Sequence, residues 1–309
     1  MRSLERILEA PDNLEAFVAE VGAGLGAVYG EESKRDYLAS GAHRFALTLA
    51  HPRVNAWAWR EAGRVAGLLW ATQRAGVGYI CFIHVLRDFL GRGIEHALIR
   101  HAVADLRRCN VHAIVSECLC HNELDLAGAF GPLGLQRVER LLMIAPLTAP
   151  ALACDTPPRS APCEREDWYG AAGVIFDAYR DHPDRLIHPD VCARDSCERF
   201  VSSAANGAYG QSRLDYIRHI SCEGRMAGMI LGCEVAPRTG FVLQVAVRPE
   251  YQGRGLGGHL LRELAGEFRA AGLREAGLGV TASNPARRLY ERLGFEARRP
   301  VDAYVWWRE

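Results

Sequence analysis

The sequence has no excess of charge of either sign. Its 309 residues include 37 acidic side chains and 37 lysines and arginines, which leaves a formal net charge of zero at pH 7. Proteins that bind the phosphates of nucleic acids or an anionic membrane surface usually carry a surplus of basic residues. The balanced composition therefore gives no reason to expect nucleic acid or a membrane as a partner.

Long apolar runs are also absent. No stretch reaches the roughly 18 consecutive apolar residues that a transmembrane helix requires. The first six residues, Met1 to Arg6, lead into a charged segment rather than into the apolar core of a signal peptide. We therefore expect a cytoplasmic protein.

The ten cysteines do not have the spacing of a disulfide framework. They are scattered mostly among apolar neighbours, which in a cytoplasmic protein is typical of reduced thiols. Cys118, Cys120 and His121 form the one cluster with metal-binding residue types. No second Cys/His pair is spaced to complete a tetrahedral zinc site, so we expect no metal.

A glycine-rich loop lies between an apolar strand and an amphipathic helix. Phe241 to Val247 predicts a buried strand, and apolar residues recur on one helical face from Leu256 to Phe268. The glycines at 253, 255, 257 and 258 tolerate positive φ and let backbone N–H groups face a ligand. Because such groups at a helix N-terminus attract anions, the pattern predicts a phosphate-binding loop.

Two common phosphate-binding loops do not fit this spacing. The Gly-Lys-Ser/Thr ending of a Walker motif is missing, and the glycines do not follow the Gly-x-Gly-x-x-Gly pattern of dinucleotide-binding loops. The spacing Gln252-x-x-Gly255-x-Gly257 resembles instead the acyl-coenzyme A loop of the GNAT superfamily of N-acetyltransferases. The segment from Val280 to Phe295, with Asn284-Pro285 and Tyr290, is similar to the strand and helix that follow in that family.

The resemblance implies a cosubstrate, acetyl-CoA or another acyl-CoA, and no metal. It implies that Asn284 contacts the pantetheine arm and that Tyr290 lies near the thioester sulfur as general acid, a role that a phenol of ordinary pKa near 10 suits. Backbone N–H groups near Ala246 would stabilise the oxyanion. The residues expected to hold the cosubstrate are Val245, Ala246, Val247, Gln252, Gly253, Arg254, Gly255, Leu256, Gly257, Gly258, Asn284, Arg287 and Tyr290.

The general base has several candidates. Many family members carry Glu or Asp on the strand before the loop, where this chain has Gln244, an amide that orients groups but accepts no proton. Glu234 and His219 are the other candidates for this catalytic role. A third option is an acceptor that needs little base catalysis.

A polar segment between the first helices of the second half is expected to form the acceptor wall. It contains the residues His182, Asp184 and His188. Neighbouring carboxylates tune a histidine or bind a cationic acceptor, while Asp residues in such a loop also serve as helix caps. Both interpretations stay open at this point.

The glycine loop occurs twice in the chain. Ile83 to Glu95 aligns without a gap on Val245 to Gly257 at a shift of 162 residues, and an apolar helical stripe and a Leu-Gly turn follow in both copies. So long a match indicates duplication of a whole domain. Leu90, Glu95 and Phe130 replace Gln252, Gly257 and Tyr290, so we expect the first copy to be degenerate.

We therefore expect an α/β (α+β) fold of two tandem GNAT-like domains. Each would have a mixed, mostly antiparallel twisted sheet flanked by helices. A segment with five prolines predicts a linker at 151–162 between a degenerate domain at 1–150 and a catalytic domain at 163–309. The run from Ala303 to Trp307 is expected to close the second sheet.

The resulting hypothesis is an acyl-CoA dependent N-acyltransferase, most simply an acetyltransferase, acting on the amine of a small metabolite or natural product. The tandem arrangement is similar in architecture to the mycothiol synthases. We expect a monomer or homodimer with a small-molecule acceptor as partner. The alternatives are a noncatalytic acyl-CoA binding or sensor protein, and an acyl-CoA decarboxylase or hydrolase on the same fold.

Overall fold

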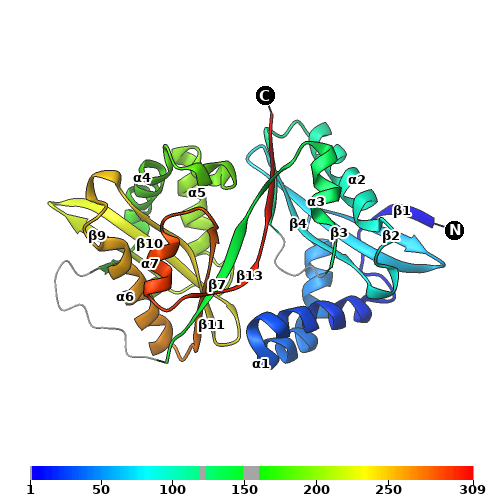
Figure 1. Cartoon of the computed structure of the whole chain (residues 1–309), viewed down its shortest axis with the longest axis horizontal. Helices are drawn as coiled ribbons and strands as arrows, with labels where there is room; N and C mark the ends of the chain where they lie inside the picture. Colours follow the sequence, from blue (N-terminus) through cyan, green and yellow to red (C-terminus); the bar gives the residue numbers. More distant parts are fainter. Residues whose placement is uncertain (1, 118–122, 149–159, 309) are drawn as a thin grey trace. The chain divides into compact units, whose positions relative to one another are not determined.

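The computed structural model describes residues 2–117, 123–148 and 160–308 (Figure 1). The chain forms two compact units. The first unit comprises Met1–Glu139 and Val301–Glu309, and the second comprises Arg140–Pro300. Cys118, Cys120 and His121 lie outside the described residues, as does the expected linker up to residue 159.

The first unit is built on a seven-stranded sheet with the order β1-β2-β3-β4-β5-β14-β6. Its strands are β1 (Arg2–Ile7), β2 (Val54–Glu61), β3 (Arg64–Arg74), β4 (Val77–Val85), β5 (Ala113–Glu117), β6 (Gln136–Val138) and β14 (Ala303–Trp307). Its helices are α1 (Leu14–Ala50), which is interrupted at Gly30, α2 (Ile94–Arg108) and α3 (Leu126–Phe130). None of the described helices combines the length and apolarity needed to cross a membrane.

The second unit has a seven-stranded sheet with the order β13-β7-β12-β11-β10-β9-β8. Its strands are β7 (Arg140–Pro146), β8 (Ala161–Pro162), β9 (Ile217–Cys222), β10 (Arg225–Ala236), β11 (Thr239–Val247), β12 (Glu275–Thr281) and β13 (Glu296–Pro300). Its helices are α4 (Trp168–Tyr179), α5 (Arg194–Ala205), α6 (Leu256–Ala270) and α7 (Arg287–Arg292). Short 3-10 turns include η3 (Arg165–Asp167), η4 (Pro183–Leu186), η5 (Pro189–Val191), η6 (Leu214–Tyr216) and η7 (Pro249–Tyr251).

The two sheets repeat one topology. In each, the strand before the glycine loop runs parallel to the next strand in sequence, β4 to β5 and β11 to β12. The other described strand pairs are antiparallel. The expected α/β fold of two similar halves with mixed, mostly antiparallel sheets is confirmed. At the edges of the sheets, β1 pairs with β2 in the first unit, and the 3-10 turn η6 immediately precedes β9 in the second.

The two compact units do not divide at the expected linker, 151–162, but at residues 139/140 and 300/301. Strand β7 precedes the proline-rich segment, yet it pairs with β12 and β13 in the second sheet. Strand β14 does not close the second sheet but takes the corresponding place in the first, between β5 and β6. Each half thus contributes one strand to the sheet of the other. The proline-rich segment did not mark the boundary, because prolines indicate a break in local structure, whereas the partner of a strand is selected by pairing with residues far away in the chain.

Helices cover both faces of the second sheet. On one face Leu260, Leu264 and Phe268 of α6 pack against the core that contains Ile230. On the other face α4 and α5 pack over Met229 and its neighbours. Successive residues of β10 therefore point to opposite layers, as the pleat of a strand requires.

Candidate functional site

Strands β11 and β12 separate where they approach the glycine loop. Their parallel ladder extends only from the pair Thr239/Glu275 to the pair Val242/Leu278. Beyond it, β11 continues along β10 and β12 continues along β7. In the described sheet, residues 243–247 therefore have no ladder partner on the side of β12. Along residues 245–247, the peptide groups that point to that side have no strand partner there and are available to a ligand, except the Val247 carbonyl, which accepts from Gln252.

The glycine loop leads from η7 into the N-terminus of α6. Gly253 and Gly255 have φ values of 74° and 80°, in the left-handed region that favours glycine. Gly255 is the N-cap of α6 and makes no side-chain cap bond. A Cβ built at either position would meet nothing within 4 Å. The open space beside these two glycines thus lies next to the N-terminus of α6, the positive end of the helix dipole, which suits an anion.

Two polar side chains of the loop contact the backbone. Gln252 Nε2 donates to the carbonyl of Val247 at 3.0 Å and so braces the loop against the end of β11. Arg254 donates to the carbonyl of Glu250 at 3.2 Å, and its guanidinium lies 5.2 Å from the centre of the Tyr251 ring. Arg254 is exposed, and the acceptor of this hydrogen bond is a neutral carbonyl.

The other glycines of the loop have different surroundings. A Cβ at Gly257 would lie 3.8 Å from Leu289, an ordinary contact. A Cβ at Gly258 would lie 3.2 Å from the same side chain, so this glycine allows α6 to approach α7. Leu256 is buried in the core and anchors the first turn of α6.

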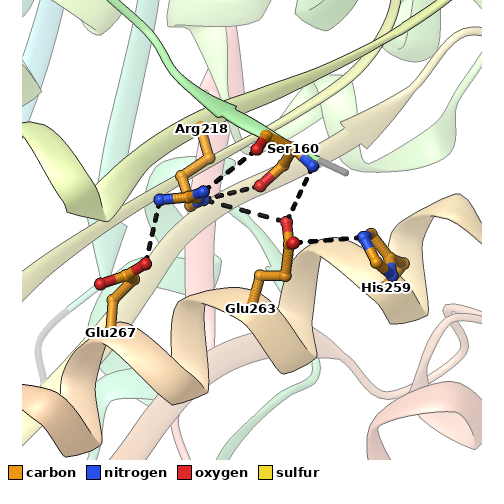
Figure 2. A network of polar contacts seen from close by, with 5 residues as sticks. All are labelled: Ser160, Arg218, His259, Glu263 and Glu267. Carbon is orange, nitrogen blue, oxygen red and sulfur yellow. Dashed lines mark hydrogen bonds and ion pairs between the residues drawn. The ribbon is translucent and has the colours of Figure 1, made fainter. Parts of the chain in front are cut away.

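A network of ion pairs holds α6, the helix that begins at the loop (Figure 2). Arg218 on β9 lies 3.0 Å from Glu267 Oε1 and 3.9 Å from Glu263 Oε2. Arg218 also donates to Ser160 Oγ at 2.6 Å, and the N–H of Ser160 donates to Glu263 at 3.2 Å. His259 Nε2 lies 3.4 Å from the other oxygen of Glu263. These contacts tie α6 to the sheet and fix the direction of its N-terminus.

Asn284 and Tyr290 lie on either side of the start of α7. Asn284 Oδ1 accepts the N–H of Ala286 at 2.9 Å, so Asn284 forms a turn three residues before the helix, whose N-cap is Ala286. Its Nδ2 donates to Asp184 at 2.8 Å and so connects α7 to the predicted acceptor segment. Tyr290 is buried, and its ring meets that of Phe295 edge-on at 6.2 Å.

The acceptor segment and Gln244 meet at Tyr179, the last residue of α4. The Tyr179 hydroxyl donates to Gln244 Oε1 at 3.2 Å. Its ring centroid lies 5.3 Å from that of His182 and 6.3 Å from that of His188. Asp184 is buried, with Oδ2 3.9 Å from His182 Nδ1. The structure thus gathers the predicted residues of this segment around one tyrosine.

Burial raises the pKa of the Tyr290 hydroxyl well above its usual range, and Tyr179 and Asp184 raise it further. Burial also raises the pKa of Tyr179. Arg140, a buried residue of β7 that donates to Thr281 Oγ1 at 3.2 Å, lowers the pKa of both tyrosines. Both phenols therefore keep their protons at neutral pH, while a nearby cation stabilises the tyrosinate form.

Sequence patterns did not single out Tyr179 or Arg140. Tyr179 belongs to no motif, and its one signal is its place at the end of an apolar helix, next to the His/Asp segment. Arg140 was assigned to the first domain, and only the exchange of β7 brings it into the second unit.

Glu234 lies apart from this cluster. Its Oε1 accepts the hydroxyl of Tyr216 at 2.8 Å and lies 3.4 Å from Nε of Arg213. Glu234 lies on β10 and pairs with Gly240 on β11. Gly240 is four residues before Gln244, which corresponds to about 13 Å along the strand. The carboxylate is therefore engaged in a separate polar contact.

His219 also lies apart. It pairs with Met229 across the sheet, and Met229 pairs with Ala246, so two strand spacings, about 10 Å, separate His219 from Ala246. Its Nδ1 is 4.0 Å from Asp167.

Arg287, expected near the cosubstrate, donates to Glu291 at 2.8 Å on the exposed face of α7.

Solved structures share this architecture over nearly the whole chain. A GNAT-family N-acetyltransferase from Sphaerobacter thermophilus has 17% identity and a TM-score of 0.67, with 98% of this chain and 95% of that chain covered. A tandem GNAT protein from the clavulanic acid biosynthesis pathway has 18% identity and a TM-score of 0.56, with 99% and 98% covered. A GNAT-family acetyltransferase from Colwellia psychrerythraea has 10% identity and a TM-score of 0.55, with 99% and 100% covered. At these identities the likeness concerns the fold.

The family match comes from the sequence itself. No curated protein matches the chain. The family described as "Acetyltransferase (GNAT) family" matches residues 23–126 and 185–295, which together make up more than half of the chain and fall one in each unit. With two copies of the glycine loop on two copies of one topology, the chain belongs to the GNAT acetyltransferase family.

Proposed function

We propose that the second unit is an acyl-CoA dependent N-acyltransferase, most simply an acetyltransferase, that acylates the amine of a small molecule. The observation that carries the proposal is the separation of β11 from β12 next to the uncapped N-terminus of α6. An extended thioester arm can bind along a free strand edge, and a pyrophosphate can bind to free N–H groups at a helix N-terminus. The two features lie next to each other here.

The loop residues fit the proposed cosubstrate. The open space beside Gly253 and Gly255 leaves room for a pyrophosphate at the helix N-terminus. The free side of residues 245–247 would accept the pantetheine arm, and an N–H group there would face the oxyanion. Asn284 would direct its amide to the same arm, and Arg254 and Arg287 lie on the surface as possible phosphate ligands.

Tyr290 is the proposed proton donor. As the amine nitrogen forms its bond to the acyl carbon and the carbon–sulfur bond breaks, the leaving thiolate takes the proton of the phenol. The proton that the acylated nitrogen then loses goes through solvent and restores the phenol. The high pKa of Tyr290 keeps the phenol protonated before this step, and the cation of Arg140 stabilises the tyrosinate that results.

Asp184 is the proposed group that receives the acceptor. It is the buried carboxylate of the cluster, so it would attract a protonated amine and take the proton that the amine must lose before attack. Gln244 and Tyr179 would orient the acceptor through their hydrogen bond, since neither side chain accepts a proton at neutral pH.

Thiol release tests the proposal. The full chain would be mixed with acetyl-CoA and panels of amines, aminoglycosides, amino acids and thiols, and the acylated product would be identified by mass spectrometry. We expect release that depends on an amine acceptor and is lost in Gly255→Glu, which combines a strained φ with a carboxylate at the anion site. A protein that neither binds nor consumes any acyl-CoA would disprove the proposal.

A noncatalytic acyl-CoA binding protein is the second candidate. Gln244 stands at the place where many family members have a carboxylate, and this observation favours it. Such a protein would bind acetyl-CoA in calorimetry without acceptor-dependent thiol release, and Tyr290→Phe would leave its behaviour unchanged.

A further inference from the structure

A cysteine, a carboxylate and an imidazole converge at the beginning of the second unit. Cys163 follows β8, Asp167 ends η3 immediately before α4, and His219 lies on β9. One ligand atom from each of the three residues lies within 4.8 Å of the others. The three donors come from separate elements and meet on the face of the sheet that α4 covers.

One ring nitrogen of the histidine in this cluster has no hydrogen-bond partner. His219 Nδ1 is buried and has no hydrogen-bond partner. The nearest acidic oxygen, Asp167 Oδ2, is 4.0 Å away, too far for a hydrogen bond. A buried polar atom without a partner costs free energy comparable to a lost hydrogen bond, and a ligand bound at this nitrogen would remove that cost.

The other two donors are held in place by the backbone. The N–H of Cys163 donates to the carbonyl of Ile217 at 2.7 Å, and the Cys163 side chain is fully buried. Asp167 Oδ2 accepts the N–H of Glu164 at 3.0 Å as part of a capping box. The cluster is therefore a prearranged set whose members need to move little to share one ligand.

We propose that Cys163, Asp167 and His219 bind a zinc ion. Thiolate, imidazole and carboxylate are the ligands that zinc takes in proteins, and a water molecule would complete four-coordination. The charges of a thiolate and a carboxylate balance a divalent cation, which lowers the cost of burial. The metal would displace the thiol proton, which goes to solvent.

A nucleophilic role for this cysteine fits the cluster less well. A reactive thiol needs access to its substrate, and Cys163 has none of its surface exposed. Burial raises the pKa of its thiol to about 12, so without a metal it stays protonated. The proposed zinc ion would fasten the beginning of α4 to β9, and α4 carries Tyr179 at its other end. It revises the expectation of no metal, which rested on Cys118, Cys120 and His121.

Cobalt binding tests the site, because Co²⁺ enters zinc sites and gives a thiolate-to-metal charge-transfer absorption. Metal-free full-length protein would be titrated with Co²⁺ and then with Zn²⁺. We expect one Co²⁺ per chain, displaced by Zn²⁺, and a rise in Tm with Zn²⁺. Cys163→Ala should remove the charge-transfer band, and Asp167→Asn should weaken Co²⁺ binding at least about tenfold. Asparagine keeps the acceptor for the capping box, so this variant should fold.

Two matched controls separate the site from other thiols. Cys233→Ala removes another fully buried thiol of the same unit, and a Cys118→Ala/Cys120→Ala double variant removes the pair that lies outside the described residues. Both should bind Co²⁺ like the unsubstituted protein. No charge-transfer band in the unsubstituted protein, or a band that Cys163→Ala and Asp167→Asn leave unchanged, would overturn the proposal, whatever the acyltransferase assay shows.

Discussion

The two glycine loops of this chain share a backbone and differ in side chains. Gly91 and Gly93 in the first unit have φ values of 73° and 71°, close to the 74° and 80° of Gly253 and Gly255. In both units the second glycine is the N-cap of a 15-residue helix and makes no side-chain cap bond. In both, the parallel ladder beside the loop stops after four residue pairs. The backbone arrangement for binding an anion is therefore present twice.

The side chain in the first helical turn differs. Where α6 has Gly257, α2 has Glu95, which is 5% exposed and whose Oε2 is buried without a hydrogen-bond partner. A carboxylate at this place competes with an external anion for the helix dipole and repels it. A single side chain can thus separate an anion-binding loop from one that binds none.

The strand before the loop also differs between the units, with an apolar residue in the first and a polar residue in the second. Phe82 of β4 occupies the place of Gln244, stacks on Trp70 at 3.9 Å and meets Phe45 edge-on at 5.5 Å. Apolar packing thus fills the first unit where the second has the Tyr179–Gln244 hydrogen bond. The comparison shows that the same duplicated backbone can hold either packed apolar side chains or a cluster of polar side chains. That the first copy is degenerate stays a prediction, which the following experiments test.

Tyr290→Phe gives the largest expected effect, because it places the residue type of Phe130 into the second unit. We expect kcat to fall about 100- to 10,000-fold, the usual contribution of a general acid, with little change in acyl-CoA affinity. Since the pKa of Tyr290 is raised, the unsubstituted enzyme should not lose activity through its ionisation as pH rises to about 10. Steady-state kinetics across pH would measure both effects. Tyr216→Phe, a buried tyrosine bonded to Glu234, is the matched control, and equal losses in the two variants would contradict the role.

Gly257→Glu transfers the carboxylate of the first loop into the second. The φ of Gly257 is not positive and a Cβ fits there, so the fold should persist, while repulsion should weaken acyl-CoA binding about 100-fold. Calorimetry would measure the change. The neutral Gly257→Gln separates charge from size: if it weakens binding equally, the repulsion argument fails.

Tyr179→Phe removes the hydroxyl that bonds Gln244 and leaves an apolar ring beside it, which is one step toward the aromatic packing of the first unit. The loss of one hydrogen bond, about 1 kcal/mol, should raise the KM for the acceptor about fivefold and leave acyl-CoA binding unchanged. Tyr169→Phe, on an exposed part of the same helix, should change neither constant. An effect confined to acyl-CoA binding would place Tyr179 in a different role.

His84 gives the smallest effect, on the stability of the first unit. Burial lowers the pKa of His84 below its ordinary 6.5, although Glu20, 2.9 Å away, raises it in part, and Arg87 lowers it. A histidine with a lowered folded-state pKa stabilises the fold above pH 6.5, and this stability is lost as pH falls toward the folded-state pKa. Thermal unfolding at about pH 7.5 and 5.5 would measure it by fluorescence, because five of the six tryptophans lie in this unit. His84→Gln should remove part of the pH dependence, and an unchanged dependence would exclude His84 as its source.

Features that depend on nearby residues were predicted from the sequence. The strand before the loop, the amphipathic helix after it and the turn at Gly294 follow from periodicity and from glycines at positive φ. The duplication followed from a fixed offset. The polar segment that contains His182 was expected to form the acceptor wall, which stays a prediction; in the structure Tyr179 contacts both His182 and Gln244.

Features that depend on distant pairing were not predicted. Neither Arg140 nor Tyr179 stands in a motif, and both enter the site through tertiary contacts. The same is true of Cys163, Asp167 and His219, whose spacing in the chain resembles no zinc motif. Glu234 and His219, expected as bases, lie on strands whose pairing sets them apart from Gln244.

The sequence by itself determined the family, the number of halves and the position of a glycine loop in each half, because glycine conformation and hydrophobic periodicity act over a few residues. Tertiary structure alone decided which strand closes each sheet and which side chains surround Tyr290. Strands β7 and β14 are both short apolar segments that fit the same place in a sheet, so pairing energy rather than local pattern selects between them. That selection brings Arg140 to the second unit, where its charge acts on the two tyrosines.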